Sequence, residues 1–208
     1  MGEHLSCYAV IDFETTGMSP ALGARATEIG ICIVESGRIV DRYQSLINPG
    51  QPIPYDIQQL TGISNAMVRT APPVSEVMSA ALAFVGGRPL LAHNASFDAK
   101  FWQAGLSDLG RRDSGEWLCS LKLARRVFPA LASYRLSALA AHLRLPQAGQ
   151  FHRAMADAQC TAHLAIAAQR QLCSDYHLAE APCELLLAVQ AAAKRQLAKV
   201  VAPYQQGG

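Results

Sequence analysis

The chain has 208 residues, of which 50% are hydrophobic, and its formal net charge at pH 7 is +2. A chain of this length and apolar content can bury a full core, which excludes an intrinsically disordered protein and favours one main domain with a small appendage. It contains no run of about 18 apolar residues, and a strand pattern begins by Tyr8, so we expect no membrane span, no signal peptide and a cytoplasmic location. The six cysteines show no CxxC spacing, which argues against a zinc knuckle or a redox pair.

Strand and helix patterns alternate along the chain. Strand patterns come first, at 7–14, 28–35 and 38–47, and the short turn between the last two predicts an antiparallel meander. A Pro/Gly-rich connection then leads to a short helical piece near 55–63, a helix at 73–87 that ends in glycine, and a strand at 88–94. Further helices are predicted at 95–110, 120–128, 134–143 and 152–172, with a short strand at 116–120. This order predicts an α/β protein with a mixed sheet.

The pattern changes near Ser174. A polar connection, "SDYHLAEAP", leads to "CELLLAVQAAAKRQLAKVV", which is typical of a single Ala-rich amphipathic helix that could pack on the domain or on a partner. We therefore place the main domain at residues 1–173 and a helical extension at residues 174–208.

Two acids interrupt the first strand pattern, in "VIDFETTG". Residues i and i+2 of a strand face the same side, so Asp12 and Glu14 should project together. The other residues of this strand have the apolar pattern of a buried one. Burying two unpaired carboxylates costs several kcal/mol, so either the strand lies at an exposed edge or a cation neutralises the pair. Hard divalent cations such as Mg²⁺ prefer carboxylate oxygens.

Two further acids occupy unusual positions. Asp98 lies just past the strand "PLLAHN", near the start of a helix for which Asn94 is a plausible N-cap. Asp157 falls on the apolar stripe of the helix at 152–172, between small alanines that would permit a close approach to the sheet. Four misplaced carboxylates on three elements favour a metal cluster over coincidence.

The segments "DFETTG", "HNASFD" and "HRAMAD" resemble the three motifs of the DEDD-type 3′-to-5′ exonucleases of the histidine subgroup, the family of the epsilon proofreading subunit of bacterial replicative DNA polymerase. The resemblance spans roughly residues 7 to 172. It implies a ribonuclease H-like fold, with a mixed five-stranded sheet and helices on both faces. It also implies that Asp12, Glu14, Asp98 and Asp157 bind two divalent metal ions, Mg²⁺ or Mn²⁺, and that His152 is the general base.

His152 precedes Asp157 by five residues and is expected on a loop before the helix, from which it could reach a water at the metals. Thr15, Thr16 and Gly17 directly follow the first two acids, where hydroxyls and a missing side chain would let a nucleotide come close. The stretch "LTGIS", with Leu60, Thr61 and Ile63, is similar to the family segment that packs on the terminal base. Together with Asn94 and Phe97, these residues form the predicted substrate site, although Phe97, Leu60 and Ile63 suit a core equally well.

Positive charge concentrates in the middle of the chain. Residues 100–153 hold nine Lys or Arg and three Asp or Glu, a net charge of +6. These cations could line a phosphate path or form a solvated basic face. They are Lys100, Arg111, Arg112, Lys122, Arg125, Arg126, Arg135, Arg144 and Arg153.

The resemblance predicts hydrolysis of single-stranded nucleic acid from its 3′ end, with release of nucleoside 5′-monophosphates, and favours DNA over RNA. Proofreading or repair would follow, with a DNA polymerase subunit as a possible partner. A ribonuclease or short-oligonucleotide hydrolase of the same family is an alternative. A third alternative is a non-catalytic interaction module. The complete set of four acids and one histidine argues against this alternative.

Overall fold

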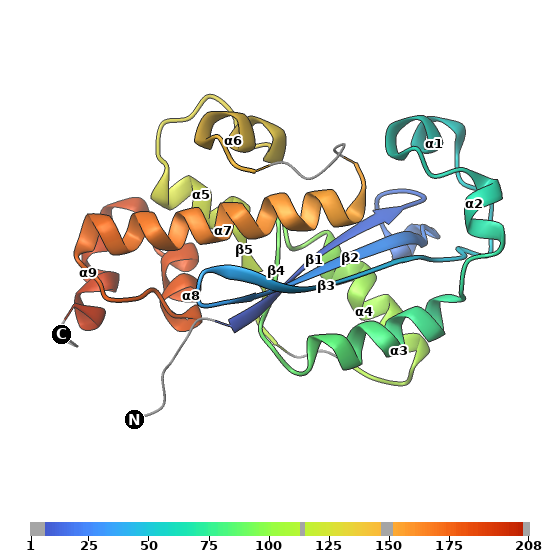
Figure 1. The fold of residues 1–208 in the computed structure, drawn as a ribbon, viewed down its shortest axis with the longest axis horizontal. Coiled ribbons are helices and arrows are strands. Elements are labelled where there is room, and N and C mark those ends of the chain that lie inside the picture. The colour runs from blue at the N-terminus through green and yellow to red at the C-terminus, as the bar shows by residue number, and fades with distance from the viewer. Residues whose placement is uncertain (1–6, 113–114, 147–151, 206–208) are drawn as a thin grey trace.

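The computed structural model describes residues 7–112, 115–146 and 152–205. Its strands form one mixed sheet in the order β3-β2-β1-β4-β5 (Figure 1). Their bounds are β1 Cys7–Thr15, β2 Ala26–Glu35, β3 Arg38–Leu46, β4 Leu90–Ala92 and β5 Leu118–Cys119. The first three strands pair antiparallel, whereas β4 pairs parallel to β1 and β5 parallel to β4. The predicted meander and mixed sheet are confirmed, and β4 and β5 are shorter than their sequence patterns.

Helices follow the predicted order, except that α2, Asn65–Arg69, was not predicted from the sequence. Their bounds are α1 Tyr55–Thr61, α2 Asn65–Arg69, α3 Val74–Val85, α4 Asp98–Asp108, α5 Ser120–Val127, α6 Leu136–Leu143, α7 Ala154–Tyr176, α8 Cys183–Ala191 and α9 Leu197–Val201. Short 3-10 turns form at η1 Pro20–Leu22, η2 Lys194–Gln196 and η3 Ala202–Tyr204. The predicted glycine end of α3 is confirmed, because Gly86 adopts the left-handed conformation with φ 61°. Across the described residues, no helix combines the length and the apolar character needed to cross a membrane.

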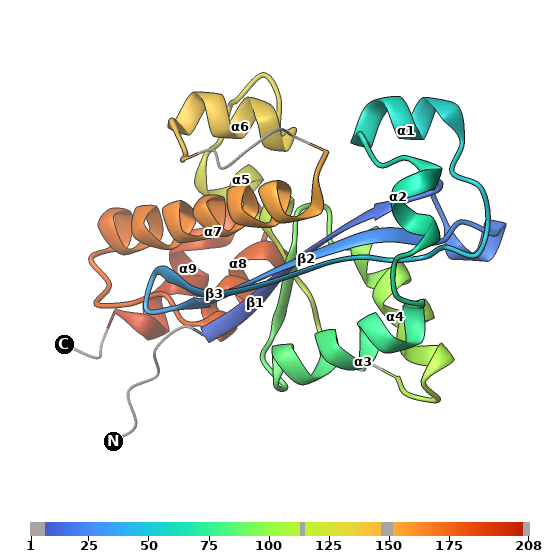
Figure 2. The ribbon, with the colours of Figure 1, turned by 45° about the vertical axis from the view of Figure 1, so that its right-hand side comes forward.

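Helices cover both faces of the sheet, as predicted (Figures 1 and 2). The side chains of β1 alternate between the two faces because successive strand residues point to opposite sides. Tyr8 and Val10 join a core cluster with α5, α7 and α8, whereas Ile11 and Phe13 join a second cluster with α3 and α4. The two acids of β1 continue the first series and therefore face α7.

The residues after α7 do not form the single helix predicted for 183–201. Ala192, with ψ 151°, and Ala193, with ψ 146°, are extended and separate α8 from η2 and α9. The break is explained by tertiary contacts. The carbonyl oxygen of Ala192 accepts a hydrogen bond of 2.8 Å from Nε of Arg126, and the break lets Leu197 and Val201 return to the core. These contacts outweigh the helix propensity of an Ala-rich segment.

The extension shares the core of the main domain. Leu185, Leu186 and Val189 of α8 are fully buried in the same cluster as Tyr8 and Val10. In addition, the side chain of Gln190 accepts from the backbone N–H of Cys119 at 2.7 Å and donates to the carbonyl oxygen of Trp117 at 3.0 Å, so α8 covers β5 at the edge of the sheet. The helix α7 itself continues past the predicted boundary at residue 173, to Tyr176.

Candidate metal-binding and catalytic site

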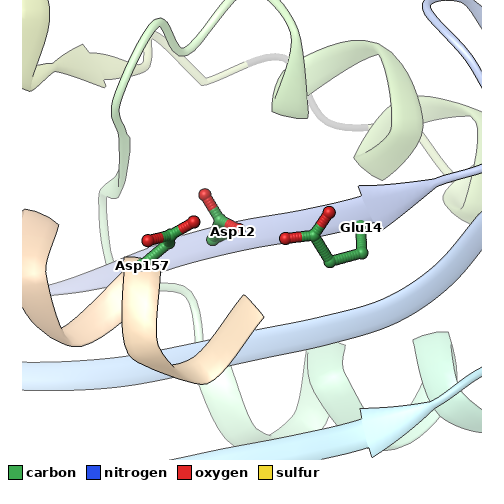
Figure 3. Close-up of side chains that lie close together, drawn as sticks. All are labelled: Asp12, Glu14 and Asp157. Carbon is green, nitrogen blue, oxygen red and sulfur yellow. The ribbon is translucent and has the colours of Figure 1, made fainter. Parts of the chain in front are cut away.

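Three carboxylates converge where β1 meets the first turn of α7. Asp12 and Glu14 project from the same face of β1, and Asp157 projects toward them from α7 (Figure 3). One ligand oxygen from each residue lies within 4.8 Å of those of the other two. The juxtaposition that the sequence predicts for these three acids is therefore present.

Asp157 keeps one oxygen free in this cluster. Its Oδ2 accepts a hydrogen bond of 3.0 Å from the backbone N–H of His152, whereas its Oδ1 is buried without a hydrogen-bond partner. A buried carboxylate oxygen without a partner is costly unless a cation occupies the site. Hard carboxylate oxygens at this spacing fit a divalent cation such as Mg²⁺ or Mn²⁺.

The approach of α7 to the sheet depends on Gly30 of β2, which sequence reasoning missed. Gly30 pairs with Asp12 in the antiparallel ladder. A Cβ atom at Gly30 would lie 2.4 Å from the backbone carbon of Ala154 and 2.5 Å from the backbone nitrogen of Met155. Only glycine therefore lets the first turn of α7, and with it Asp157, come this close to β1.

Asp98 is the most deeply buried of the four predicted ligands, with 2% of its surface exposed. It is the first residue of α4, and its Oδ1 accepts a hydrogen bond of 3.1 Å from the backbone N–H of Phe13, between the two acids of β1. The prediction that Asn94 caps this helix is wrong. The N-cap is Phe97, and Asn94 lies in the preceding turn with φ 66°, where its carbonyl oxygen accepts from the N–H of Phe97 at 2.9 Å.

Burial raises the pKa of all four predicted metal ligands, and repulsion between acids raises it further for Asp12, Glu14 and Asp98. The pKa of Asp12 rises well above its usual value, first through burial and then through the charges of Asp98 and Asp157. Burial and neighbouring acids raise the pKa of Glu14 to about 8, and burial with the charge of Asp157 raises that of Asp98 to about 8. Burial also raises the pKa of Asp157. Such a group of carboxylates in the metal-free protein favours the binding of protons or of cations.

A fifth acid, Glu28 of β2, supports the site and was not recognised in the sequence. Glu28 pairs with Glu14 in the ladder and is fully buried. Its Oε1 lies 2.7 Å from Nη2 of Arg153, and its Oε2 accepts from the backbone N–H of Ala154 at 3.0 Å. Although burial acts to raise the pKa of Glu28, hydrogen bonds from Arg153, Ala154 and Gln44 lower it overall. Glu28 therefore fixes the start of α7 against the sheet.

His152 lies outside α7, as predicted, and its side chain is exposed. It lines a cleft of about 860 Å³ together with Asp157, Asn94, Arg125 and Arg135. In both ribbon views α1 and α6 stand on either side of the N-terminal end of α7, above the site (Figures 1 and 2). The cleft therefore brings a histidine and two of the predicted cations together with Asp157.

His93 has a structural role. Its Nδ1 lies 2.8 Å from Oγ of Ser120, and its Nε2 lies 3.1 Å from the carbonyl oxygen of Tyr134. Burial lowers the pKa of His93, so the ring is a neutral bridge between α5 and the segment that leads to α6. Both of its nitrogens are occupied, and His152 is the histidine whose ring is open to the cleft.

The residues after the β1 acids form a hydrogen-bonded turn. Thr15 Oγ1 donates to the carbonyl oxygen of Gly17 at 2.7 Å, and Thr16 Oγ1 accepts from the N–H of Arg25 and from Nε2 of Gln51, each at 2.9 Å. Both threonines are buried. Their hydroxyls thus shape the turn, in addition to the substrate role predicted for them.

The other predicted substrate residues divide into exposed and buried ones. Leu60 is 50% exposed at the end of α1, whereas Ile63 is fully buried in a small cluster with Ile53 and Val68. Thr61 is also buried, and its hydroxyl donates to the carbonyl oxygen of Ile57. Half-buried Phe97 packs on Phe101, with ring centroids 5.1 Å apart. Of Leu60, Thr61 and Ile63, Leu60 is therefore the residue whose side chain is exposed.

Comparisons with known proteins agree with this geometry. The exonuclease family model (RNase_T) matches residues 9–165. The chain is 34% identical over 174 residues to the DNA polymerase III subunit epsilon of Aquifex aeolicus, covering 83% of this chain and 85% of that protein. It is 37% identical over 157 residues to the PolC-type DNA polymerase III of Clostridium perfringens, and 39% identical over 155 residues to the 3′-5′ exonuclease DinG of Bacillus subtilis. The matches span 76% and 74% of this chain but only 11% and 16% of those two proteins.

Solved structures show the same fold. Exonuclease X in complex with 5′ overhanging duplex DNA superimposes with a TM-score of 0.64 at 27% identity, covering 92% of this chain and 98% of that chain. The nuclease domain of 3′hExo, described as a DEDDh family member bound to rAMP, superimposes with a TM-score of 0.68 at 19% identity, covering 80% of this chain and 93% of that chain. The predicted ribonuclease H-like fold is confirmed by these neighbours and by the sheet order. With its family match, its relatives and its four acids and one histidine in their motifs, the chain belongs to the exonuclease family, in the DEDDh group.

Proposed function

We propose that the protein is a 3′-to-5′ exonuclease that removes nucleoside 5′-monophosphates from the ends of single-stranded DNA with two divalent metal ions, Mg²⁺ or Mn²⁺. The observation that carries the proposal is the convergence of Asp12, Glu14 and Asp157, whose ligand oxygens lie within 4.8 Å of one another. Oδ1 of Asp157 is buried without a hydrogen-bond partner, and the fourth acid, Asp98, is buried beside β1. Asp157 of this group also lines the cleft of about 860 Å³, which would receive the end of the strand.

Asp12, Glu14, Asp98 and Asp157 would hold the metals. When bound there, divalent cations would neutralise charge on the scissile phosphate and lower the pKa of the attacking water. His152, exposed at the rim of the cleft, would accept the proton of that water as its oxygen attacks phosphorus and the bond from phosphorus to the 3′-oxygen breaks. The 3′-oxygen leaves with the shortened strand and takes up a proton.

Other residues would position the strand. Arg125 and Arg135 line the cleft and are suited to phosphate oxygens, because a guanidinium group presents several donors in a fixed plane. Exposed Leu60 would contact the terminal base. These contacts involve no base edge, so we propose little sequence preference.

DNA is proposed as the substrate because the relatives that match the chain include a subunit of DNA polymerase III and PolC-type polymerases. The match over most of the Aquifex aeolicus epsilon subunit also supports a polymerase partner and a role in proofreading or repair. RNA is the alternative substrate, since 3′hExo is described as bound to rAMP.

The test is hydrolysis of matched 5′-labelled single-stranded DNA and RNA oligonucleotides with Mg²⁺, with Mn²⁺ and with a chelator. We expect a ladder that shortens from the 3′ end, nucleoside 5′-monophosphate products and faster cleavage of DNA. His152→Ala, which removes the proposed base, should lower the single-turnover rate roughly 10²- to 10⁴-fold. His142→Ala is the matched control, because His142 is an exposed histidine at the end of α6.

Asp12→Asn should abolish cleavage and keep the fold. Absence of hydrolysis of either polymer by the wild-type protein with both metals would contradict the proposed activity. Faster cleavage of RNA than of DNA would leave the exonuclease assignment intact and overturn the proposed substrate.

A further inference from the structure

A second cavity, of about 790 Å³, lies beside α7 and outside the acid cluster. Four arginines from three segments line it: Arg38 and Arg42 of β3, Arg144 directly after α6, and Arg170 of α7. All four side chains are exposed. We call this surface the arginine groove.

The guanidinium groups of the arginine groove form no ion pair among the described residues, although the carboxylate of Asp41 accepts a hydrogen bond of 2.8 Å from the backbone N–H of Arg42. Among the described residues, ion pairs join Arg88 to Glu35 and Arg153 to Glu28, and neither pair involves a groove arginine. Glu35, which is the ladder partner of Arg38, is thus already bound to Arg88. Asp175, one residue beyond the groove, accepts a hydrogen bond of 2.7 Å from Gln171.

The positive charge of the groove affects the pKa of His163. His163 of α7 lines the groove and is half-buried. Burial lowers the pKa of His163, and the charges of Arg42 and Arg170 lower it further. Four like charges held together repel one another, so the arrangement favours an anionic ligand.

The groove and the acid cluster lie at different positions along the same helix and on different sides of it. Asp157 and Arg170 are both on α7, 13 residues apart, and a rise of 1.5 Å per residue separates them by about 20 Å. At 3.4 Å per nucleotide, the rise of a stacked strand, this distance corresponds to at most about six nucleotides, and to fewer in an extended single strand. The groove also has an apolar floor, which includes Ile39, Leu145 and Ile166.

We propose that the arginine groove binds the phosphodiester backbone of nucleic acid, on the 5′ side of the nucleotides that enter the active site. This inference rests on the proposed function, because the bound strand is taken to be the exonuclease substrate. Exposed guanidinium groups contact phosphate oxygens without reading sequence, so the groove would add affinity and leave sequence preference unchanged. An acidic protein segment is less favoured, because the groove shares α7 with one of the acids that would hold the 3′ end and lies about 20 Å from it along the helix axis.

The first test measures binding without hydrolysis. A fluorescently labelled 20-nucleotide single-stranded DNA is titrated with the full chain in a chelator, at several salt concentrations, and followed by anisotropy. For the double variant Arg42→Gln/Arg170→Gln we expect affinity to fall roughly tenfold and the slope of log affinity against log salt to flatten by about 1.4, at about 0.7 per lost phosphate contact. The matched control is Arg111→Gln/Arg112→Gln, which removes two exposed arginines after α4.

The second test separates the groove from the active site. The p-nitrophenyl ester of thymidine 5′-monophosphate carries a single nucleotide and cannot reach the groove, so the groove variant should hydrolyse it at the wild-type rate. The same variant should show a raised KM for the 20-nucleotide strand. Because binding is measured without metal, the groove can be tested even if the protein proves not to hydrolyse DNA.

Wild-type affinity and an unchanged salt slope in the groove variant would overturn the proposal and leave an acidic protein segment as the alternative ligand. An equal loss of affinity in the control variant would also overturn the proposal, because binding would then depend on exposed arginines in general and not on the groove. Charge reversal with Arg42→Glu/Arg170→Glu should weaken binding further than the glutamine variant, and circular dichroism should show that every variant is folded.

Discussion

At the scale of single residues, the carboxylates at the end of β1 and the start of α7 repel one another in the metal-free protein. Asp12 and Glu14 on β1, Asp98 on α4 and Asp157 on α7 each have a raised pKa, and burial is the largest cause in every case. Folding therefore brings mutually repelling carboxylates together in a buried place, at a cost in free energy. A cation that binds only the folded state would relieve it and stabilise the protein.

We predict that the metal-free protein loses stability as the pH rises. Glu14 and Asp98 have pKa values raised to about 8 in the folded state, against about 4 in an unfolded chain. The folded state therefore binds more protons between these values, so the contribution of the cluster is fully present below about pH 4 and is lost as the pH rises through about 8. Thermal unfolding in a chelator, from pH 5 to 9, measures this loss.

The same experiment has two controls. Millimolar Mn²⁺ should raise the Tm more at pH 8 than at pH 6, because protons compete with the metal at the lower pH. Asp12→Asn should be at least as stable as the wild type without metal and should gain less from Mn²⁺. A wild-type Tm that does not respond to Mn²⁺ at either pH would contradict the metal site.

A second prediction at this scale concerns Glu28. Glu28→Gln keeps the shape of the side chain but removes the charge that binds Arg153 and the N–H of Ala154. Hydrogen bonds to charged groups contribute about 1.5–3 kcal/mol each, so we expect a loss of that order in the free energy of unfolding, together with slower cleavage. Glu35→Gln breaks the half-exposed pair with Arg88 and should cost less than about 1 kcal/mol. Equal losses in the two variants would show that Glu28 has no special role.

At the scale of elements, the position of α7 against β1 and β2 decides whether a site forms. The helix carries Asp157 in its first turn, and Gly30 and Glu28 of β2 hold that turn close to the sheet. The helix also carries Arg170 of the arginine groove near its other end. A change in the position of this one helix would therefore affect both surfaces.

We predict that Gly30→Ala displaces the start of α7. The added Cβ would meet backbone atoms of Ala154 at 2.4–2.5 Å, and backbone cannot move aside as a flexible side chain can. Such overpacking costs about 1–3 kcal/mol, and it should also reduce hydrolysis and the Tm gain from Mn²⁺. Gly17→Ala is the stability control, because its Cβ would make an ordinary 3.4 Å contact with Ala24. Wild-type activity in Gly30→Ala would show that the close approach is not required.

At the scale of the whole molecule, the residues after α7 complete the core. Leu185, Leu186 and Val189 are fully buried beside Tyr8 and Val10 of β1. The sequence predicts that a chain ending after Ser174 still folds, since its motifs end by Asp157. The packing of α8 and α9 leads to a different expectation, because removal of these helices would expose the α7 side of the sheet to water.

We predict that Leu186→Ala costs about 2–5 kcal/mol in the free energy of unfolding, the usual range for a large-to-small change in a core. The matched control is Leu187→Ala, which should lower the free energy of unfolding by less, because Leu187 is only half-buried. At a temperature where Leu186→Ala is still folded, it should cleave DNA at the wild-type rate, because α8 lies away from the acid cluster. A stability loss no larger than that of Leu187→Ala would show that the extension packs only loosely.

The sequence by itself determined the order of the elements, the face of β1 that carries Asp12 and Glu14, and the position of Asp157 at the start of a long helix. These features follow from local periodicity, since a repeat of two residues in a strand or of 3.6 in a helix fixes which side chains share a face. The spacing of the three motifs also determined the family, which a single motif could not have done.

Only the tertiary structure decided which distant segments meet. The pairing of Glu28 with Arg153, the close approach at Gly30 and the complete burial of Ile63 all depend on contacts between residues that no local pattern connects. The break after α8 has the same origin, because burial of Leu197 and the bond from Arg126 outweigh the helix propensity of alanine. The excess of positive charge at residues 100–153 did not predict the arginine groove, because Arg38, Arg42 and Arg170 lie outside that segment and meet only where β3 lies beside α7.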